Sequence, residues 1–210
     1  MVAFLQDAAA RVGEPMTFAK LCSDAWGIWL AGGWAMAPIA VVAALMFGVG
    51  VRTWLRLLGK GHRSTPEKVW RLWLTNPSHR EGPIGELMDE VADEPTLEAS
   101  AAAFAGLTAA ELAPFGRDLK VMKTCIAAAP LLGLLGTVTG MLGTFGALAT
   151  GGGGDQTMAA IAKGISEALI TTETGLVVAL PGLFFHYQLS RRRDHYAAFL
   201  AHLETVCTQH

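Results

Sequence analysis

The chain has 210 residues, of which 52% are hydrophobic and only 16% are charged, and its mean hydropathy is +0.39. This composition is too apolar for an ordinary soluble domain of this length and indicates an integral membrane protein. A formal net charge of −2 and an isoelectric point near 6.3 argue against the basic surface that nucleic acid requires, so we expect no nucleic-acid partner.

The first segment, residues 1–25, carries Asp7, Arg11 and Glu14 among its apolar residues. Because it has no continuous apolar core, it does not resemble a cleaved signal peptide. Its short helical patterns favour an interfacial helix that leads into the membrane. We therefore predict a periplasmic or interfacial segment here.

Three later stretches are long enough to cross a bilayer. Residues 25–51 and 124–154 contain no Lys, Arg, Asp or Glu, and residues 164–190 are interrupted only by Glu167, Glu173 and His186. A spanning helix needs roughly 20 residues to cross about 30 Å of hydrocarbon. We predict transmembrane helices over 26–51, 125–150 and 158–189, with Pro38 kinking the first. The fold class is therefore an all-α membrane protein with three spans.

The distribution of basic residues predicts the orientation. Most of the 16 Lys and Arg residues lie in 52–123 or in Arg191, Arg192 and Arg193, and only Arg11, Lys20 and Lys163 lie elsewhere. The positive-inside rule then places the helical region 52–124 and the tail 190–210 in the cytoplasm. The N-terminus and the turn 151–157 lie outside. Residues 95–121 read as one or two helices that continue into the second span.

Glycines form a stripe in the second span. Gly133, Gly136, Gly140 and Gly143 recur at i, i+3, i+7 and i+10, which places them along one face where another backbone can approach closely. The short GGGGDQ turn makes the second and third spans an antiparallel hairpin. We predict that this stripe is a helix-packing surface.

Polar groups follow the hairpin through the membrane. Thr137 and Thr172 are equidistant from the turn, so they lie at similar depth, about 20 Å from the cytoplasmic ends of their helices. Glu167 lies about 7 to 8 Å closer to the outside than Thr172. An ionised acid in hydrocarbon costs several kcal/mol unless it faces protein, water or a proton partner, so Glu167 is a candidate functional residue.

Further polar residues in the third span have open roles. Glu173 points about 120° away from Glu167 on an ideal helix, so both acids cannot face the same line of water. Thr171 and Thr174 add two hydroxyls, and Thr171, Glu173 and Thr174 are candidates for a pore or an interface. A membrane threonine also commonly donates to its own i−4 carbonyl with no further role.

The segments APLLGLLGTVTGM and GISEALITTETGLVVALPG, joined by the Gly turn, resemble the last two membrane helices of the MotA/TolQ/ExbB proton channel family, in particular its three-span ExbB/TolQ branch. GGWAMAPI in the first span is a weaker match. The resemblance implies a homo-pentamer in the bacterial inner membrane that encloses single-span ExbD/TolR-like partners carrying a membrane aspartate. Proton flow would then drive a TonB-like or Tol-like protein. No cofactor is expected.

The resemblance also assigns residues. The family threonine of the GLLGT segment falls on Thr137, the glutamate of the SEAL segment on Glu167, and the threonine five residues later on Thr172. These would form the proton pathway. Glu173 departs from the family pattern, which usually has a small apolar residue there.

Other functions leave weaker signals. Cys22, Cys125 and Cys207 form no CxxC pair, and the histidines near the C-terminus (His186, His195, His202 and His210) lack a second ligand cluster, so no metal is expected. The turn lacks the Lys-Ser/Thr of a phosphate-binding loop. No nucleophile with a base appears, which disfavours an enzyme. A non-conducting membrane scaffold and a flagellar-type stator stay open as alternatives, as does sodium as the coupling ion.

Overall fold

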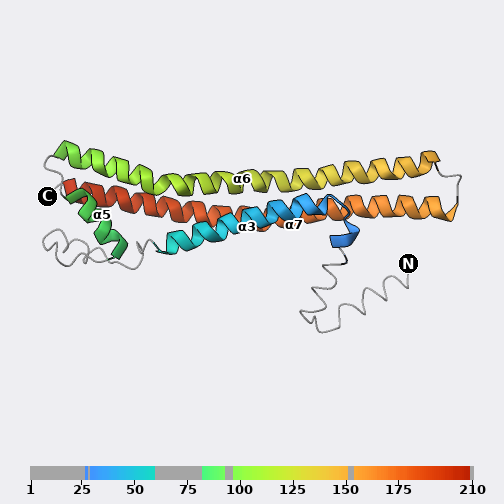
Figure 1. The fold of residues 1–210 in the computed structure, drawn as a ribbon, viewed down its shortest axis with the longest axis horizontal. Helices are drawn as coiled ribbons and strands as arrows, with labels where there is room; N and C mark the ends of the chain where they lie inside the picture. Colours follow the sequence, from blue (N-terminus) through green and yellow to red (C-terminus); the bar gives the residue numbers. More distant parts are fainter. Residues whose placement is uncertain (1–26, 28, 60–81, 93–96, 151–153, 209–210) are drawn as a thin grey trace, which may run out of the picture. The chain divides into compact units, whose positions relative to one another are not determined.

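The computed structural model describes residues 27, 29–59, 82–92, 97–150 and 154–208. These include the helices α3 (Met36–Gly59), α5 (Gly82–Ala92), α6 (Leu97–Thr150) and α7 (Asp155–Thr208), shown in Figure 1. Every regular element in this part of the chain is helical, as predicted. The predicted N-terminal segment 1–25 and residues 151–153 of the predicted turn lie outside the described residues.

Three helices are long and apolar enough to cross a membrane, within Met36–Gly59, Ala102–Ala149 and Asp155–Val206. The chain is therefore a multi-pass membrane protein with three candidate spans. Helices α6 and α7 have 54 residues each, or about 80 Å at 1.5 Å per residue. Because hydrocarbon is only about 30 Å thick, each helix also extends far beyond it. The region 97–121 is one continuous helix with the second span, and the tail after Ser190 is helical to Thr208.

The first apolar stretch is not one continuous helix. Residues 29–31 are helical, Gly33 has a φ of +67°, and α3 begins only at Met36. The amide of Met36 donates to the Gly33 carbonyl at 3.3 Å, which begins the new helix. Pro38 lies in the first turn of α3, where a missing N–H is tolerated, so the break precedes the proline and is made by glycine.

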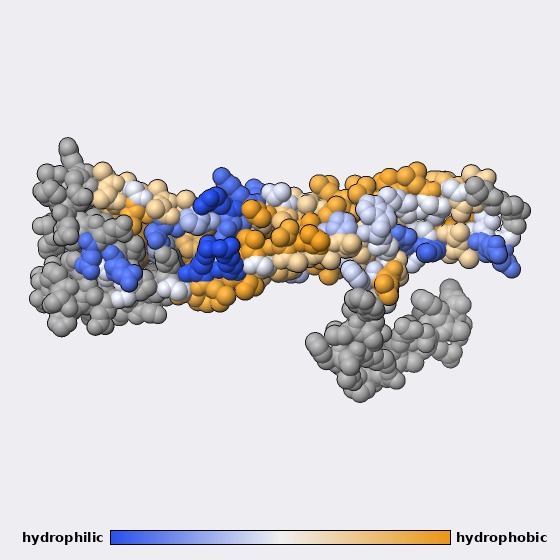
Figure 2. Space-filling view, in the orientation of Figure 1, coloured by the Kyte–Doolittle hydropathy of each residue, from blue (hydrophilic) through white to orange (hydrophobic). Residues whose placement is uncertain are grey.

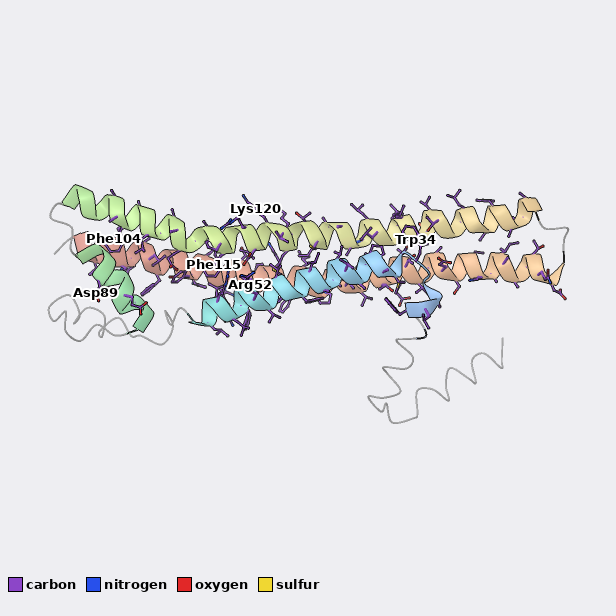
Figure 3. All side chains as sticks on the ribbon, viewed as in Figure 1. Trp34, Arg52, Asp89, Phe104, Phe115 and Lys120 are labelled. Carbon is purple, nitrogen blue, oxygen red and sulfur yellow. The ribbon has the colours of Figure 1, made fainter. Side chains whose placement is uncertain are left out.

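Contacts divide the chain into two compact units, one of Met1–Ile39 with Leu132–Gly175 and one of Ala40–Leu131 with Leu176–His210. The second unit has three buried clusters, in which large side chains of α6 and α7 meet those of α3 or α5. They are Ile84, Met88, Phe104, Leu203 and Val206; Leu57, Phe115, Tyr196 and Leu200; and Leu119, Met122 and Leu189. Phe104 and Phe115, labelled in Figure 3, are the buried phenylalanines of these clusters.

Polar and aromatic contacts tie α3 to its neighbours within the second unit. The fully buried Thr53 hydroxyl donates to the Val49 carbonyl at 2.9 Å and to the Asp118 carboxylate at 3.0 Å. The Arg192 guanidinium lies 3.7 Å from the centroid of the Trp54 ring, which also contacts Phe185. Tryptophan is enriched at membrane–water interfaces, and Trp54 lies three residues beyond the predicted end of the first span at residue 51.

Large apolar side chains remain exposed along the three spanning helices. In Figure 2 orange covers much of the visible surface between patches of hydrophilic blue. The exposed apolar side chains include Val41 and Leu45 of α3, Leu131, Leu134, Leu142 and Phe145 of α6, and Leu169, Leu180 and Phe184 of α7. So much exposed apolar surface is unfavourable in water and fits a chain surrounded by lipid or by further subunits.

A buried tyrosine offers a first test of packing in the second unit. The Tyr196 side chain is fully buried, its ring meets Phe115 edge to face, and its hydroxyl donates to Glu111 at 3.1 Å. Burial, and then the neighbouring Glu111 carboxylate, raises the pKa of Tyr196, so this hydroxyl stays protonated and remains a donor near neutral pH.

We expect Tyr196→Phe to lower the unfolding free energy by about 1 to 1.5 kcal/mol, because one buried hydrogen bond is lost. Thermal unfolding of the purified protein in detergent measures this change. Tyr187, which is 60% exposed on the same helix, supplies the control variant Tyr187→Phe, which should leave the midpoint unchanged. Equal shifts in both variants would refute the role assigned to the Tyr196 hydroxyl.

Candidate functional site

In the first unit, glycines bring α6 and α7 into close contact. A Cβ added to Gly140 would lie 2.7 Å from the Gly164 carbonyl oxygen, and one added to Gly133 would lie 2.9 Å from the Thr171 carbonyl oxygen. A Cβ added to Gly136 would likewise meet the Thr171 side chain. A Cβ on Gly143, in contrast, would meet nothing within 4 Å. Three of the four stripe glycines therefore pack on α7, and Gly143 does not.

Thr171 lies inside this packed surface. Its side chain is fully buried against Gly136, and its hydroxyl donates to the carbonyls of Glu167, at 3.1 Å, and Ala168, at 3.0 Å. Both bonds stay within its own helix. Within one subunit Thr171 is therefore a packing residue of the hairpin, with its hydroxyl proton already used.

Thr172 and Thr137 lie at the edge of the packed surface and are partly exposed. The Thr172 hydroxyl lies 3.3 Å from the Gly133 carbonyl of α6 and 3.2 Å from the Ala168 carbonyl of its own helix. The Thr137 hydroxyl donates to the Leu134 carbonyl at 2.7 Å, one turn along α6 from Gly133. Each hydroxyl oxygen keeps lone pairs that can accept a hydrogen bond from another proton donor.

The two acids of the third span have different surroundings. Glu173 is exposed, whereas Glu167 is partly buried and its carboxylate lies directly against the backbone of Gly33. Thr174 is partly exposed, and its hydroxyl donates to the Ile170 carbonyl at 2.8 Å. The environment of Glu167 is therefore built partly by the segment before α3.

The three residues assigned to the proton pathway do not form one cluster within a single subunit. Glu167 and Thr172 are five residues apart, about 140° around an ideal helix, so they flank the packed stripe of Ala168 and Thr171 from opposite sides. Thr172 contacts α6 at Gly133, near Thr137, whereas Glu167 contacts Gly33. Neither Glu167 nor Thr172 is enclosed by packing inside the hairpin, in contrast to Thr171.

Gly33 is the residue of this site that the sequence did not predict. The GGWAMAPI segment contains two adjacent glycines followed by a proline, which is a recognisable signal for a helix break and a new helix start. The absence of charge across the stretch favoured one uninterrupted helix instead. Trp34, labelled in Figure 3, follows this break and is exposed.

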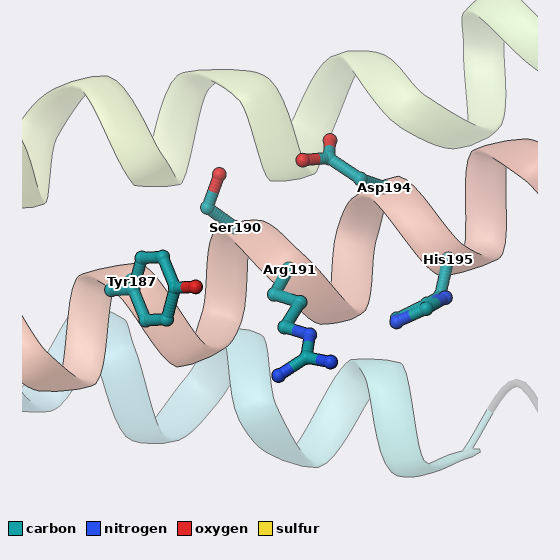
Figure 4. A pocket seen from close by; sticks show the side chains of 5 residues that line it. All are labelled: Tyr187, Ser190, Arg191, Asp194 and His195. Carbon is teal, nitrogen blue, oxygen red and sulfur yellow. The ribbon is translucent and has the colours of Figure 1, made fainter.

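The second unit contains a pocket whose lining residues all come from a single helix. It is lined by Tyr187, Ser190, Arg191, Asp194 and His195, all from α7, as Figure 4 shows. Ser190 and Asp194 project to one side of the helix and Arg191 and His195 to the other. Among the described residues no group of three or more His, Cys, Asp or Glu could hold a metal ion.

Comparison with known proteins gives consistent matches. The chain is 46% identical over 101 residues to biopolymer transport protein ExbB-like 1 of Synechocystis, 38% over 77 residues to the Tol-Pal system protein TolQ of Pseudomonas aeruginosa, and 37% over 87 residues to biopolymer transport protein ExbB of Salmonella typhimurium. These matches cover 46%, 37% and 40% of this chain, but only 40%, 32% and 34% of the relatives' lengths.

The relatives carry the names of the ExbB/TolQ branch, in agreement with the resemblance seen in the sequence. Residues 81–201 match the family described as the MotA/TolQ/ExbB proton channel family, which is more than half of the chain. That match includes the glycine stripe, Glu167 and the three threonines of the third span, Thr171, Thr172 and Thr174. The chain belongs to the MotA/TolQ/ExbB proton channel family.

Proposed function

We propose that this chain is the proton-conducting stator subunit of an ExbB–ExbD-like or TolQ–TolR-like motor in the bacterial inner membrane. Five copies would surround the single membrane helices of an ExbD/TolR-like partner, whose aspartate exchanges protons. The motion that results would be passed to a TonB-like or Tol-like protein. At 100 mV each proton supplies about 2.3 kcal/mol, so several protons drive one working step.

The observation that carries this proposal is the placement of Glu167. It is a carboxyl group inside an apolar span, partly buried, held by protein on one side and left outside the packed surface of the hairpin. Acids in membrane helices are expensive and are retained chiefly where ions or protons pass. Thr137 and Thr172 then extend the path along the hairpin, and we propose that all three line the route of the proton.

The proposed orientation follows from charge. With residues 52–124 and 190–210 in the cytoplasm, the N-terminus and the turn between α6 and α7 lie in the periplasm. The lysines and arginines around Arg52 and Lys120, both labelled in Figure 3, would then lie near the cytoplasmic headgroups. Glu173 is exposed and lies two residues after Thr171, about 160° around an ideal helix from the side that packs on α6, so it would face a neighbouring subunit.

Proton flux into liposomes tests the function directly. The chain, co-expressed with an ExbD/TolR-like single-span protein, is reconstituted with a pH-sensitive dye inside the vesicles, and an inside-negative potassium diffusion potential is imposed. We expect acidification above that of protein-free vesicles. A non-conducting scaffold predicts no additional acidification, and a sodium-coupled stator predicts sodium uptake, read with a sodium-sensitive dye, without additional acidification.

Thr172 gives a sharper test of the path. Thr172→Val keeps the volume but removes the hydroxyl near the Gly133 carbonyl, so we expect flux to fall about tenfold, the kinetic equivalent of about 1.4 kcal/mol. Thr172→Ser restores a hydroxyl and should keep most of the flux. The proposed role of Thr172 fails if the valine and serine variants conduct equally well.

A further inference from the structure

The break before α3 and the acid of α7 meet at one point. Gly33 has a φ of +67°, a backbone conformation that residues other than Gly and Asn rarely adopt. The Glu167 carboxylate also occupies the space where a Cβ of residue 33 would lie. Gly33 is therefore required twice, once by its backbone angle and once by the close approach of the acid.

The neighbouring contacts fix the same arrangement. Gly32 lies against Ile170 of α7, one turn from Glu167, so the glycine pair packs on the face of α7 that carries the acid. The Gly33 carbonyl accepts the amide of Met36, and the Trp34 carbonyl accepts that of Ala37, at 3.3 and 3.2 Å. The Glu167 carboxyl group therefore lies beside the residues that begin α3.

We propose that Gly33 is a positioning residue for the proton path. The helix break at Gly33, before α3, holds the Glu167 carboxyl group in place, and we call this position the seat of the carboxyl group. A side chain at position 33 would push the carboxyl out of this seat, although it would leave Glu167 itself intact. The inference deepens the proposed function, since positioning matters for conduction only if Glu167 carries protons. The seat itself is a structural statement that can be tested without any flux.

A double-mutant cycle tests the seat. Gly33→Asn is the informative variant, because asparagine tolerates a positive φ and so adds a side chain with little backbone strain. In the thermal denaturation of the purified complex we expect Gly33→Asn to lower the midpoint by several degrees. In a Glu167→Ala background the same substitution should lower it by less than half as much, because the side chain it displaces is absent. Equal shifts in both backgrounds would overturn the proposal.

Proton flux then tests the positioning role. We expect Gly33→Asn to lower flux by about tenfold to 100-fold, the range in which a displacement of about 1 Å acts on a reacting group. Gly48→Asn is the matched control, since it makes the same substitution on α3 where a Cβ would meet nothing within 4 Å, and it should conduct within about twofold of the parent. Gly33→Asn flux equal to that of Gly48→Asn would refute the positioning role.

A conservative change in the acid gives the last comparison. Glu167→Asp shortens the side chain by one methylene and makes room for a residue larger than glycine at position 33. The double variant Gly33→Asn/Glu167→Asp should therefore conduct better than Gly33→Asn alone, and a double variant that conducts worse would contradict the seat. If Glu167→Gln conducts normally while the denaturation cycle still shows coupling, the proposed function fails and the seat survives.

Discussion

Glu167→Gln is expected to reduce proton flux through the reconstituted complex by about 100-fold or more, the scale on which a positioned proton-transfer group acts. Glutamine has nearly the same size as glutamate, so it should still occupy the space beside Gly33. It cannot take up and release a proton at this point. The change therefore removes the chemistry of the residue and leaves the packing of α7 in place.

The matched control for this prediction is Glu173→Gln. Both acids lie on the same helix within the same apolar span, but Glu173 is exposed and points away from α6. We expect this variant to conduct within a few-fold of the parent, with its main effect on the yield of assembled complex. Co-purification of the partner separates the two effects. Normal flux in Glu167→Gln would show that Glu167 is not the proton carrier. A collapse of flux in Glu173→Gln, with normal flux in Glu167→Gln, would assign that role to Glu173 instead.

Much of the fold could be predicted because the membrane limits what a chain can do. Backbone groups in hydrocarbon must bond internally, so long uncharged stretches predict helices with little ambiguity. The short turn between the second and third spans predicts an antiparallel hairpin, and α6 ends at Thr150 while α7 begins at Asp155. Hydropathy could not show how far these helices continue outside the bilayer, because that length depends on the buried clusters around Phe104, Phe115 and Leu203.

The site was harder to predict than the fold. Residue spacing placed Thr137 and Thr172 at similar depth, but it could not show that Thr172 reaches the Gly133 carbonyl while Thr171 is enclosed against Gly136. A helical period separates neighbouring residues by angle, whereas burial depends on which face the partner helix covers. The contact between Gly33 and Glu167 joins residues far apart in sequence, and no local pattern encodes such a pair.

The glycine stripe leads to the prediction with the largest effect on packing. Gly140→Ala would place a methyl group 2.7 Å from the Gly164 carbonyl oxygen, a backbone atom that cannot rotate away, so α6 and α7 must move apart. Overpacking of this kind costs about 1 to 3 kcal/mol, and the separation would also disturb the Thr172 contact with Gly133. We expect a lower thermal midpoint in detergent together with reduced flux.

Gly143→Ala makes the same chemical change three residues further along the same helix, where a Cβ meets nothing within 4 Å. Alanine has the higher helix propensity, so this variant should be at least as stable as the parent in the thermal assay. A lower thermal midpoint in Gly140→Ala than in Gly143→Ala would show that the hairpin requires the close approach at Gly140. Identical midpoints in the two variants would refute this packing role.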